Sequence, residues 1–134
     1  MTAKKILVID DDPDILDAIQ MLLEEEGYFV TTSAKGEEAE RLAGNLPDLI
    51  LLDVLLSGHD GREIARRLKT QILTAGIPIV MMSAHPTAHK TMKDYLVDDF
   101  IAKPFDIDYF MDKIKTNLQP KCESGIMNQE LGRI

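Results

Sequence analysis

The chain lacks the features that mark several large classes of proteins. A single cysteine, Cys122, excludes an internal disulfide and any cysteine-based zinc cluster. The longest nearly apolar run, from Leu49 to Leu56, contains Asp53 and is far shorter than the roughly 20 apolar residues that span a bilayer. The first residues lead into only a short apolar run before a run of acids, so they do not form a signal peptide. We therefore expect a cytoplasmic chain without membrane insertion, and Cys122 is interpreted as an inert free thiol.

Positive charge is also scarce. The 134 residues include 15 lysines and arginines against 23 aspartates and glutamates, which gives a formal net charge of −8. A nucleic-acid-binding domain needs a basic face against the phosphates, so no direct nucleic-acid partner is expected. Neither of the glycine-rich phosphate loops, GxGxxG or GxxxxGK[ST], occurs, which argues against a nucleotide-binding enzyme.

Two kinds of segment alternate along the chain. Short apolar runs rich in β-branched residues predict five strands, at residues 6–9, 28–32, 49–52, 77–82 and 100–102. Apolar residues at helical spacing predict five helices, at residues 13–26, 39–46, 64–72, 88–96 and 107–118. This alternation predicts an α/β domain, a doubly wound five-stranded parallel sheet with helices on both faces. The periodicity stops at Pro120, so we expect residues 1–119 to form the domain and residues 120–134 to form a loosely ordered tail.

Polar residues follow the predicted strands at their carboxyl ends, where open α/β sheets bind ligands. They are Asp10, Asp11 and Asp12 after the first strand, Asp53 after the third, Ser83 after the fourth and Lys103 after the fifth. Taken singly, each has an ordinary structural explanation, such as helix capping by Asp12 and Asp14 or a solvated lysine. Asp53 directly follows four large aliphatic residues, where a carboxylate costs free energy unless it is paired or bound to a metal. The conjunction at four different strand ends indicates a site.

Three of these carboxylates, Asp10, Asp11 and Asp53, would repel one another when brought together. A hard divalent cation relieves such repulsion, and Mg²⁺ suits oxygen ligands while retaining water. A metal beside a carboxylate holds a phosphoryl group in line for attack, and aspartyl phosphates are a known type of covalent intermediate. Lys103 would place a positive charge on a phosphate oxygen, and Ser83 would donate one hydrogen bond.

The same segments resemble those of response regulator receiver domains of two-component signalling. The resemblance is carried by residues 5–14, by residues 47–53 with Gly61 eight positions later, by residues 79–84 and by residues 98–105, and it covers residues 4–119. It implies a flavodoxin-like strand order 2-1-3-4-5. Because fewer than twenty residues follow the last predicted helix, we expect a stand-alone, single-domain regulator.

For the site, the resemblance implies that Asp53 is the phosphoacceptor. Asp10 and Asp11 would be the metal-binding pair, and Asp53 and the main-chain carbonyl of Leu55 would complete the protein ligands of Mg²⁺. Lys103 would bind the phosphate.

For the switch, the resemblance implies that Ser83 is the hydroxyl drawn toward the phosphoryl group. Phe100 would be the aromatic residue that turns inward in response. The Lys103–Pro104 peptide bond would be cis, which aims the lysine amine into the site.

The implied function is a phosphorylation-dependent switch. It would accept a phosphoryl group from a histidine kinase or a phosphotransfer protein, catalyse only this transfer and slow dephosphorylation, and signal by contact with a downstream protein target. A phosphorylation-dependent homodimer is a further expectation.

The chain also departs from the family pattern. Leu56 and Ser57 replace the usual Met-Pro, and the stretch from Ser83 to Lys103 is shorter than usual. We therefore expect a more mobile loop after Asp53 and an altered fourth helix.

Other readings are open. A phosphatase of the haloacid-dehalogenase type needs a second acid where Leu55 stands. A protein-binding module that never takes phosphate would be expected to have lost Asp53, Lys103 or an acid of the pair, and all are present. His85 and His89 lie four positions apart and could bind a metal, but no third ligand is evident, so they are interpreted as surface residues.

Overall fold

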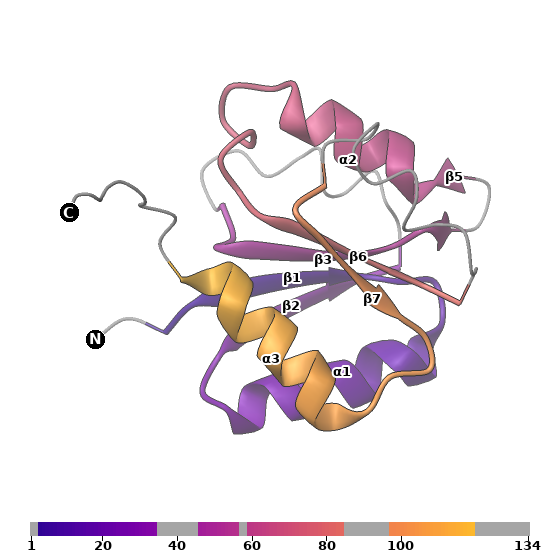
Figure 1. Cartoon of the computed structure of the whole chain (residues 1–134), viewed down its shortest axis with the longest axis vertical. Helices are drawn as coiled ribbons and strands as arrows, with labels where there is room; N and C mark the ends of the chain where they lie inside the picture. The colour runs from indigo at the N-terminus through magenta and orange to yellow at the C-terminus, as the bar shows by residue number, and fades with distance from the viewer. Residues whose placement is uncertain (1–2, 35–45, 57–58, 85–96, 120–134) are drawn as a thin grey trace, which may run out of the picture.

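The computed structural model describes residues 3–34, 46–56, 59–84 and 97–119. These residues form a layered α/β fold in which a twisted sheet separates two layers of helix (Figure 1). The predicted helix at residues 88–96 and the predicted tail lie outside the described residues, as does the predicted helix at residues 39–46 except for Leu46, which is not helical.

Five parallel strands form the main sheet. They are β1 (Lys5–Ile9), β2 (Phe29–Ser33), β3 (Leu49–Asp53), β6 (Ile79–Ser83) and β7 (Asp99–Ala102). Their order is β2-β1-β3-β6-β7, and every neighbouring pair is parallel. All five residues of β3 and of β6 are buried, as expected for central strands that are covered on both faces. The predicted sheet and its order 2-1-3-4-5 are confirmed.

In the part of the chain that the structure describes, three helices cover the two faces of this sheet. They are α1 (Pro13–Glu25), α2 (Gly61–Lys69) and α3 (Ile107–Leu118). Helices α1 and α3 lie against one face, and α2 lies against the other (Figure 1). The predicted arrangement of helices on both faces is therefore confirmed.

The start and end of α1 follow the sequence signals. Asp12 is its N-cap, and its Oδ1 accepts a hydrogen bond from the backbone N–H of Asp14 at 3.0 Å. Pro13 is the first helical residue, where its missing N–H costs nothing. Gly27, just after the helix, has φ +94°, a backbone conformation that residues other than glycine rarely adopt. The capping role expected of Asp12 is thus confirmed.

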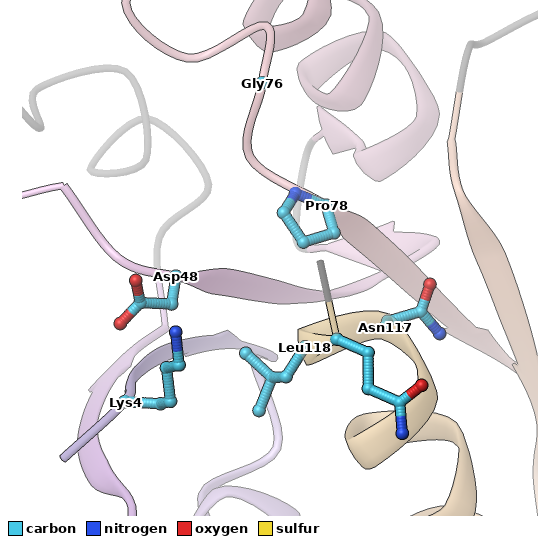
Figure 2. A pocket seen from close by; sticks show the side chains of 7 residues that line it. Lys4, Asp48, Gly76, Pro78, Asn117 and Leu118 are labelled. Atoms are coloured by element: carbon cyan, nitrogen blue, oxygen red, sulfur yellow. The ribbon is translucent and has the colours of Figure 1, made fainter. Parts of the chain in front are cut away.

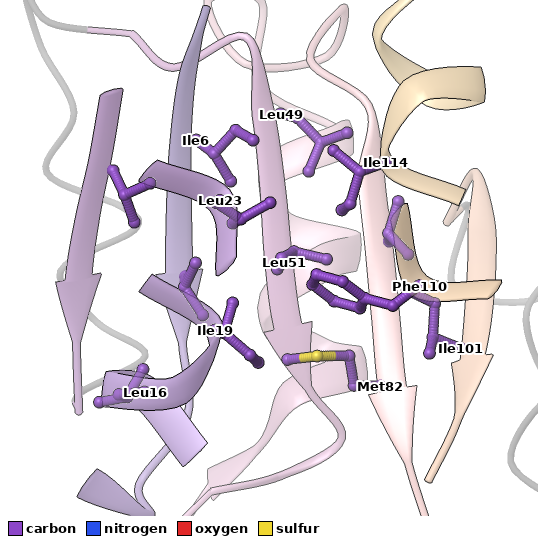
Figure 3. Packing of buried hydrophobic residues seen from close by; sticks show 13 residues of the cluster. Ile6, Leu16, Ile19, Leu23, Leu49, Leu51, Met82, Ile101, Phe110 and Ile114 are labelled. Carbon is purple, nitrogen blue, oxygen red and sulfur yellow. The ribbon is translucent and has the colours of Figure 1, made fainter. Parts of the chain in front are cut away.

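The core between the sheet and helices α1 and α3 is built from aliphatic side chains around one aromatic ring (Figure 3). Ile19 and Leu23 of α1 and Leu51 of β3 are fully buried there. Phe110 of α3 is also fully buried, and its ring stacks on Phe105 with a centroid distance of 4.8 Å. This ring therefore attaches α3 to the sheet.

Several predicted boundaries were wrong, among them the start of α2, which lies at Gly61 rather than at residue 64, and local chemistry explains two of the others. Helix α2 ends at Lys69, so Ile72 is not on its buried face but is 96% exposed. The side-chain hydroxyl of Thr74 donates to the carbonyl of Leu68, and this bond stabilises a turn in place of further helix. Strand β6 begins at Ile79 rather than at Ile77, because Pro78 has no N–H for the ladder.

A short antiparallel pair lies where we expected only a loop. Strand β4 (Leu55–Leu56) pairs with β5 (His59–Asp60), with Leu55 opposite Asp60. This hairpin connects β3 to α2.

An ion-pair network attaches α3 to β7. The Lys113 Nζ lies 2.9 Å from Asp99 Oδ1, and Asn117 Nδ2 donates to Asp99 Oδ2 at 2.9 Å. Burial would raise the pKa of Asp99, but hydrogen bonds from Lys113 and Asn117 outweigh it and lower this pKa below its ordinary 3.8. A depressed carboxylate pKa stabilises the fold above 3.8, and this stabilisation is lost as the pH falls through the lower folded-state value.

Substitution of Lys113 by Met should therefore lower the free energy of unfolding at neutral pH by about 1 kcal/mol, because Asp99 loses its cationic partner. The difference from the parent should shrink once Asp99 is protonated. Urea unfolding at neutral pH and well below pH 3.8 measures both effects. Lys115→Met is the matched control, since the pair that Lys115 forms with Glu26 is exposed to solvent. Equal losses in the two variants would contradict the prediction.

Candidate functional site

The register of the sheet brings the polar strand ends to one edge. Ile9 lies opposite Leu52, Asp53 opposite Met82, and Ser83 opposite Ala102. The residues that end or follow these strands are therefore neighbours at the carboxyl edge, although long stretches of sequence separate them. The expected meeting of polar strand ends from β1, β3, β6 and β7 is present.

Three carboxylates meet at this edge. One carboxylate oxygen each from Asp10, Asp11 and Asp53 lies within 4.8 Å of the other two. Asp10 is 1% exposed and Asp53 is 8% exposed, whereas Asp11 is exposed to solvent. The Asp10 Oδ1 also accepts the N–H of Asp12 at 3.0 Å, which fixes its orientation. An all-oxygen cluster with one solvent-facing member fits a hard cation that keeps part of its hydration shell.

Lys103 lies between two of these acids. Its Nζ is 2.9 Å from Asp10 Oδ2 and 3.3 Å from Asp53 Oδ1. Its backbone N–H donates to the carbonyl of Ser83 at 2.8 Å, and this bond continues the pairing of β7 with β6. The Lys103–Pro104 peptide bond is cis, as expected.

The electrostatics of the cluster follow from its burial. Burial, followed by the negative charge of Asp10, raises the pKa of Asp53 from 3.8 to about 6, although Lys103 opposes the change. For Lys103, burial alone would lower the pKa. The hydrogen bond to Asp10 and the charges of both acids outweigh it and raise that pKa above 10.5. The amine therefore stays charged, and the acids retain a repulsion that a divalent cation would relieve.

The residues expected to form the switch are placed as follows. Ser83 is 3% exposed and ends β6 at the same edge as Asp53. Phe100 lies opposite Met81 and packs, partly buried, against the core beneath α2. Leu55 lies in β4, two positions after Asp53. The residues His85, His89 and Cys122 lie outside the described part of the chain.

One contact at the site left no signal in the sequence. The backbone N–H of Asp10 donates to the carbonyl of Ser33 at 3.1 Å, so the end of β2 holds the first acid. Any residue at position 33 would offer this carbonyl, and only the parallel pairing of β1 and β2 brings it there.

A cavity of about 220 Å³ lies at the opposite, amino edge of the sheet (Figure 2). Its lining includes Lys4, Asp48, Gly76, Pro78 and Asn117. Asp48 is the one carboxylate among the described residues that line it, so the cavity does not reproduce the acid cluster of the carboxyl edge. We therefore assign the chemistry to the carboxyl edge.

The structure is a doubly wound α/β domain with a cluster of three acids and a lysine at its strand ends. The model of the response regulator receiver domain family matches residues 6–115. The chain belongs to this family, whose members are signalling domains that act as phosphorylation-dependent switches in two-component systems.

Relatives extend this assignment. The chain is 36% identical over 135 residues to the DNA-binding dual master transcriptional regulator RpaA of Synechocystis, a match that covers 93% of this chain and 56% of that protein. It is 37% identical over 122 residues to the phosphate regulon transcriptional regulatory protein PhoB of Pseudomonas aeruginosa, a match that covers 89% of this chain and 53% of PhoB. The chain thus spans about half the length of these regulators.

Solved structures agree with the fold. The receiver domain of a signal transduction histidine kinase from Syntrophus aciditrophicus superposes with a TM-score of 0.81 at 31% identity, which covers 95% of this chain and all of that one. The response regulator TrrA of Thermotoga maritima, in complex with Mg²⁺ and BeF, superposes with a TM-score of 0.77 at 30% identity and covers 87% of this chain and 99% of that one. Within the described residues, no helix has the length and apolar character needed to cross a membrane.

Proposed function

We propose that Asp53 of this receiver domain accepts a phosphoryl group in a Mg²⁺-dependent reaction. The observation that carries this proposal is the convergence of Asp10, Asp11 and Asp53 within 4.8 Å, with the Lys103 amine beside two of them. One carboxylate oxygen of Asp53 forms a bond to phosphorus while the bond from phosphorus to the donor atom breaks. The bonding electron pair leaves with the donor.

The residues fit a magnesium site. Asp10, Asp11, Asp53 and the main-chain carbonyl of Leu55 would hold the ion, and all four offer oxygen ligands. When bound, Mg²⁺ supplies positive charge that neutralises the phosphoryl oxygens. Lys103 supplies a second positive charge, and its pKa above 10.5 keeps the amine protonated at neutral pH.

The response to phosphorylation would begin at the same edge. The Ser83 hydroxyl would donate to a phosphoryl oxygen, and Phe100 would turn into the space that this movement opens. If the resting and the phosphorylated conformations differ in free energy by only a few kcal/mol, these new interactions are sufficient to shift the population toward the phosphorylated conformation.

The partners follow from the family. The phosphoryl donor would be a histidine kinase or a phosphotransfer protein, the output would be a contact with a downstream protein, and the phosphorylated form would be able to homodimerise. The setting would be the cytoplasm, in keeping with the single cysteine. The net charge of −8 argues against direct binding of nucleic acid by this domain. The presence of Asp53, Lys103 and both paired acids disfavours a binding module that never takes phosphate.

Intact-mass spectrometry after incubation with a small phosphodonor tests the proposal. With Mg²⁺ present, the chain should gain one phosphoryl group, and chelation of the metal should prevent the gain. Labelling of equal extent without the metal would refute the role of the acid cluster.

Excess Mg²⁺ should raise the melting temperature, because the ion binds only where folding has gathered the three acids. Binding at a hundredfold excess over the dissociation constant stabilises a fold by about 2.7 kcal/mol. The shift should vanish in Asp11→Ala and persist in Asp17→Ala, a change at an exposed position of α1. A melting curve of the parent that ignores Mg²⁺ would count against the site.

Beryllofluoride, a mimic of the phosphoryl group, should change amide hydrogen exchange at a distance from Asp53. Because Ser83 and Phe100 are the proposed moving parts, the changes should concentrate between Ser83 and Phe105. Exchange measured with and without the mimic in the presence of Mg²⁺ provides the test. Changes confined to the neighbourhood of Asp53 would be compatible with the proposed site but would contradict the proposed switch.

A further inference from the structure

The first turn of α2 lies directly against the backbone of the proposed phosphoacceptor. Gly61, the first residue of α2, is buried, and its N–H donates to the carbonyl of Val54 at 2.7 Å. A Cβ atom added to Gly61 would overlap the carbonyl oxygen of Asp53. It would also lie 3.0 Å from the carbonyl carbon of Asp53 and 3.1 Å from the carbonyl oxygen of Val54. Helix α2 and the end of β3 therefore approach each other more closely than any residue other than glycine at position 61 would permit.

Backbone conformation does not explain this glycine. Among the described glycines, only Gly27 has a positive φ, so an alanine at position 61 would meet no conformational penalty. Alanine also favours helix more than glycine does. Local preference thus predicts that Gly61→Ala is tolerated or stabilising, whereas the contact with Asp53 predicts damage.

The turn between Asp53 and α2 is held at both ends. On one side, Val54 donates its N–H to the carbonyl of Met82 at 3.0 Å, which extends the pairing of β3 with β6. On the other side, Asp60 caps α2 by accepting the N–H of Arg62 at 2.9 Å, and the Arg62 side chain binds the same carboxylate. The pairing of β4 with β5 closes the hairpin between these ends.

We propose that Gly61 is a positioning residue for phosphoryl transfer. Its contact with the Asp53 carbonyl sets the direction of the acceptor carboxylate. Gly61 also directly follows the β4–β5 hairpin, and its position therefore sets the backbone at Leu55, whose carbonyl is the proposed metal ligand. The inference rests on the proposed function of Asp53 and adds the first turn of α2 to the site. A displacement of about 1 Å at a reacting group can cost about 100-fold in rate, so a methyl group here is expected to matter.

Gly61→Ala against Gly76→Ala is the matched test. Gly76 has no atom within 4 Å of an added Cβ and lies at the amino edge of the sheet (Figure 2). The chain contains no tryptophan, so Mg²⁺ affinity is measured by isothermal titration calorimetry, and the labelling rate by intact mass with a small phosphodonor. Gly61→Ala should weaken Mg²⁺ binding and slow labelling at saturating Mg²⁺ by about 10-fold or more. Gly76→Ala should match the parent in both. Parental values in a folded Gly61→Ala would overturn the inference.

A second pair covers the case in which Gly61→Ala does not fold. Asp60→Ala removes the cap of α2, and Asp106→Ala removes the equivalent cap of α3, where Asp106 accepts the N–H of Tyr109 at 2.9 Å. Both should lose stability, Asp60→Ala the more because it also loses the pair with Arg62, but only Asp60→Ala should weaken Mg²⁺ binding. Equal Mg²⁺ affinities in these two variants would overturn the inference. If the parent binds Mg²⁺ but is never labelled at Asp53, the proposed function fails while the Mg²⁺ comparison still decides the role of Gly61.

Discussion

Replacement of Asp53 by Asn should abolish phosphorylation while the protein stays folded. The amide has nearly the shape of the carboxylate but lacks the charged oxygen that attacks phosphorus. It also removes one of three clustered negative charges. Because burial and Asp10 raise the pKa of Asp53 to about 6, loss of this charge should not lower the stability of the metal-free protein at neutral pH. Intact mass should show one added phosphoryl group in the parent and none in the variant.

Asp48→Asn is the matched control for this experiment. Asp48 lies at the opposite edge of the sheet, where it accepts the N–H of Lys5 at 2.7 Å. The Asp48→Asn variant should therefore be labelled to the same extent as the parent. Labelling of Asp53→Asn to the parental extent would show that another residue accepts the phosphoryl group. Loss of labelling in both variants would point to a general structural effect.

Substitution of Phe110 by Ala should cost about 3–5 kcal/mol of unfolding free energy, as is typical for removal of a buried aromatic ring. Phe110 is fully buried beneath α3 and stacks on Phe105, so the cavity would open where α3 meets the sheet (Figure 3). A loss of this size is a large part of the 5–15 kcal/mol of a typical domain. Unfolding in urea, followed by circular dichroism, measures it.

The neighbouring residue provides the control. Tyr109 is 40% exposed, and its ring has the Lys113 amine 5.7 Å from its centroid. Tyr109→Ala should therefore cost about 1 kcal/mol or less, the value of an exposed cation–π contact. Similar losses at positions 109 and 110 would show that α3 contributes through its helix alone and not through the buried ring.

The strands of this fold could be predicted from the sequence because a parallel sheet covered on both faces needs continuous apolar runs. The segment Leu49–Asp53 shows the pattern, and its position at the centre of the sheet follows from it. The end of α2 could not be predicted in the same way. Ile72 continues the helical spacing, but the side chains of Thr74 and Lys69 donate hydrogen bonds to backbone carbonyls and so favour the turn. These hydrogen bonds depend on the tertiary structure.

For the site, residue types at strand ends were sufficient to identify the cluster but not its internal arrangement. Asp10, Asp53 and Lys103 were predicted to meet, and they do. The sequence could not indicate that the amine lies nearer to Asp10 than to Asp53, because that difference depends on register and burial. The sequence marked Gly61 through its spacing from Asp53 in the family pattern, but the contact of Gly61 with the Asp53 backbone could not be predicted, since it depends on the angle at which α2 leaves the sheet.

The ion pair between Lys103 and Asp10 joins residues that are 93 positions apart in the chain, and the pair with Asp53 spans 50. Contacts of such long range form slowly, because the entropy of closing a long loop is lost before the contact repays it. A nascent or partly folded chain would therefore present Asp10 and Asp53 without the lysine strand that completes their surroundings. On the proposed function, acceptance of phosphate would require that β7 has docked, because Lys103 directly follows that strand.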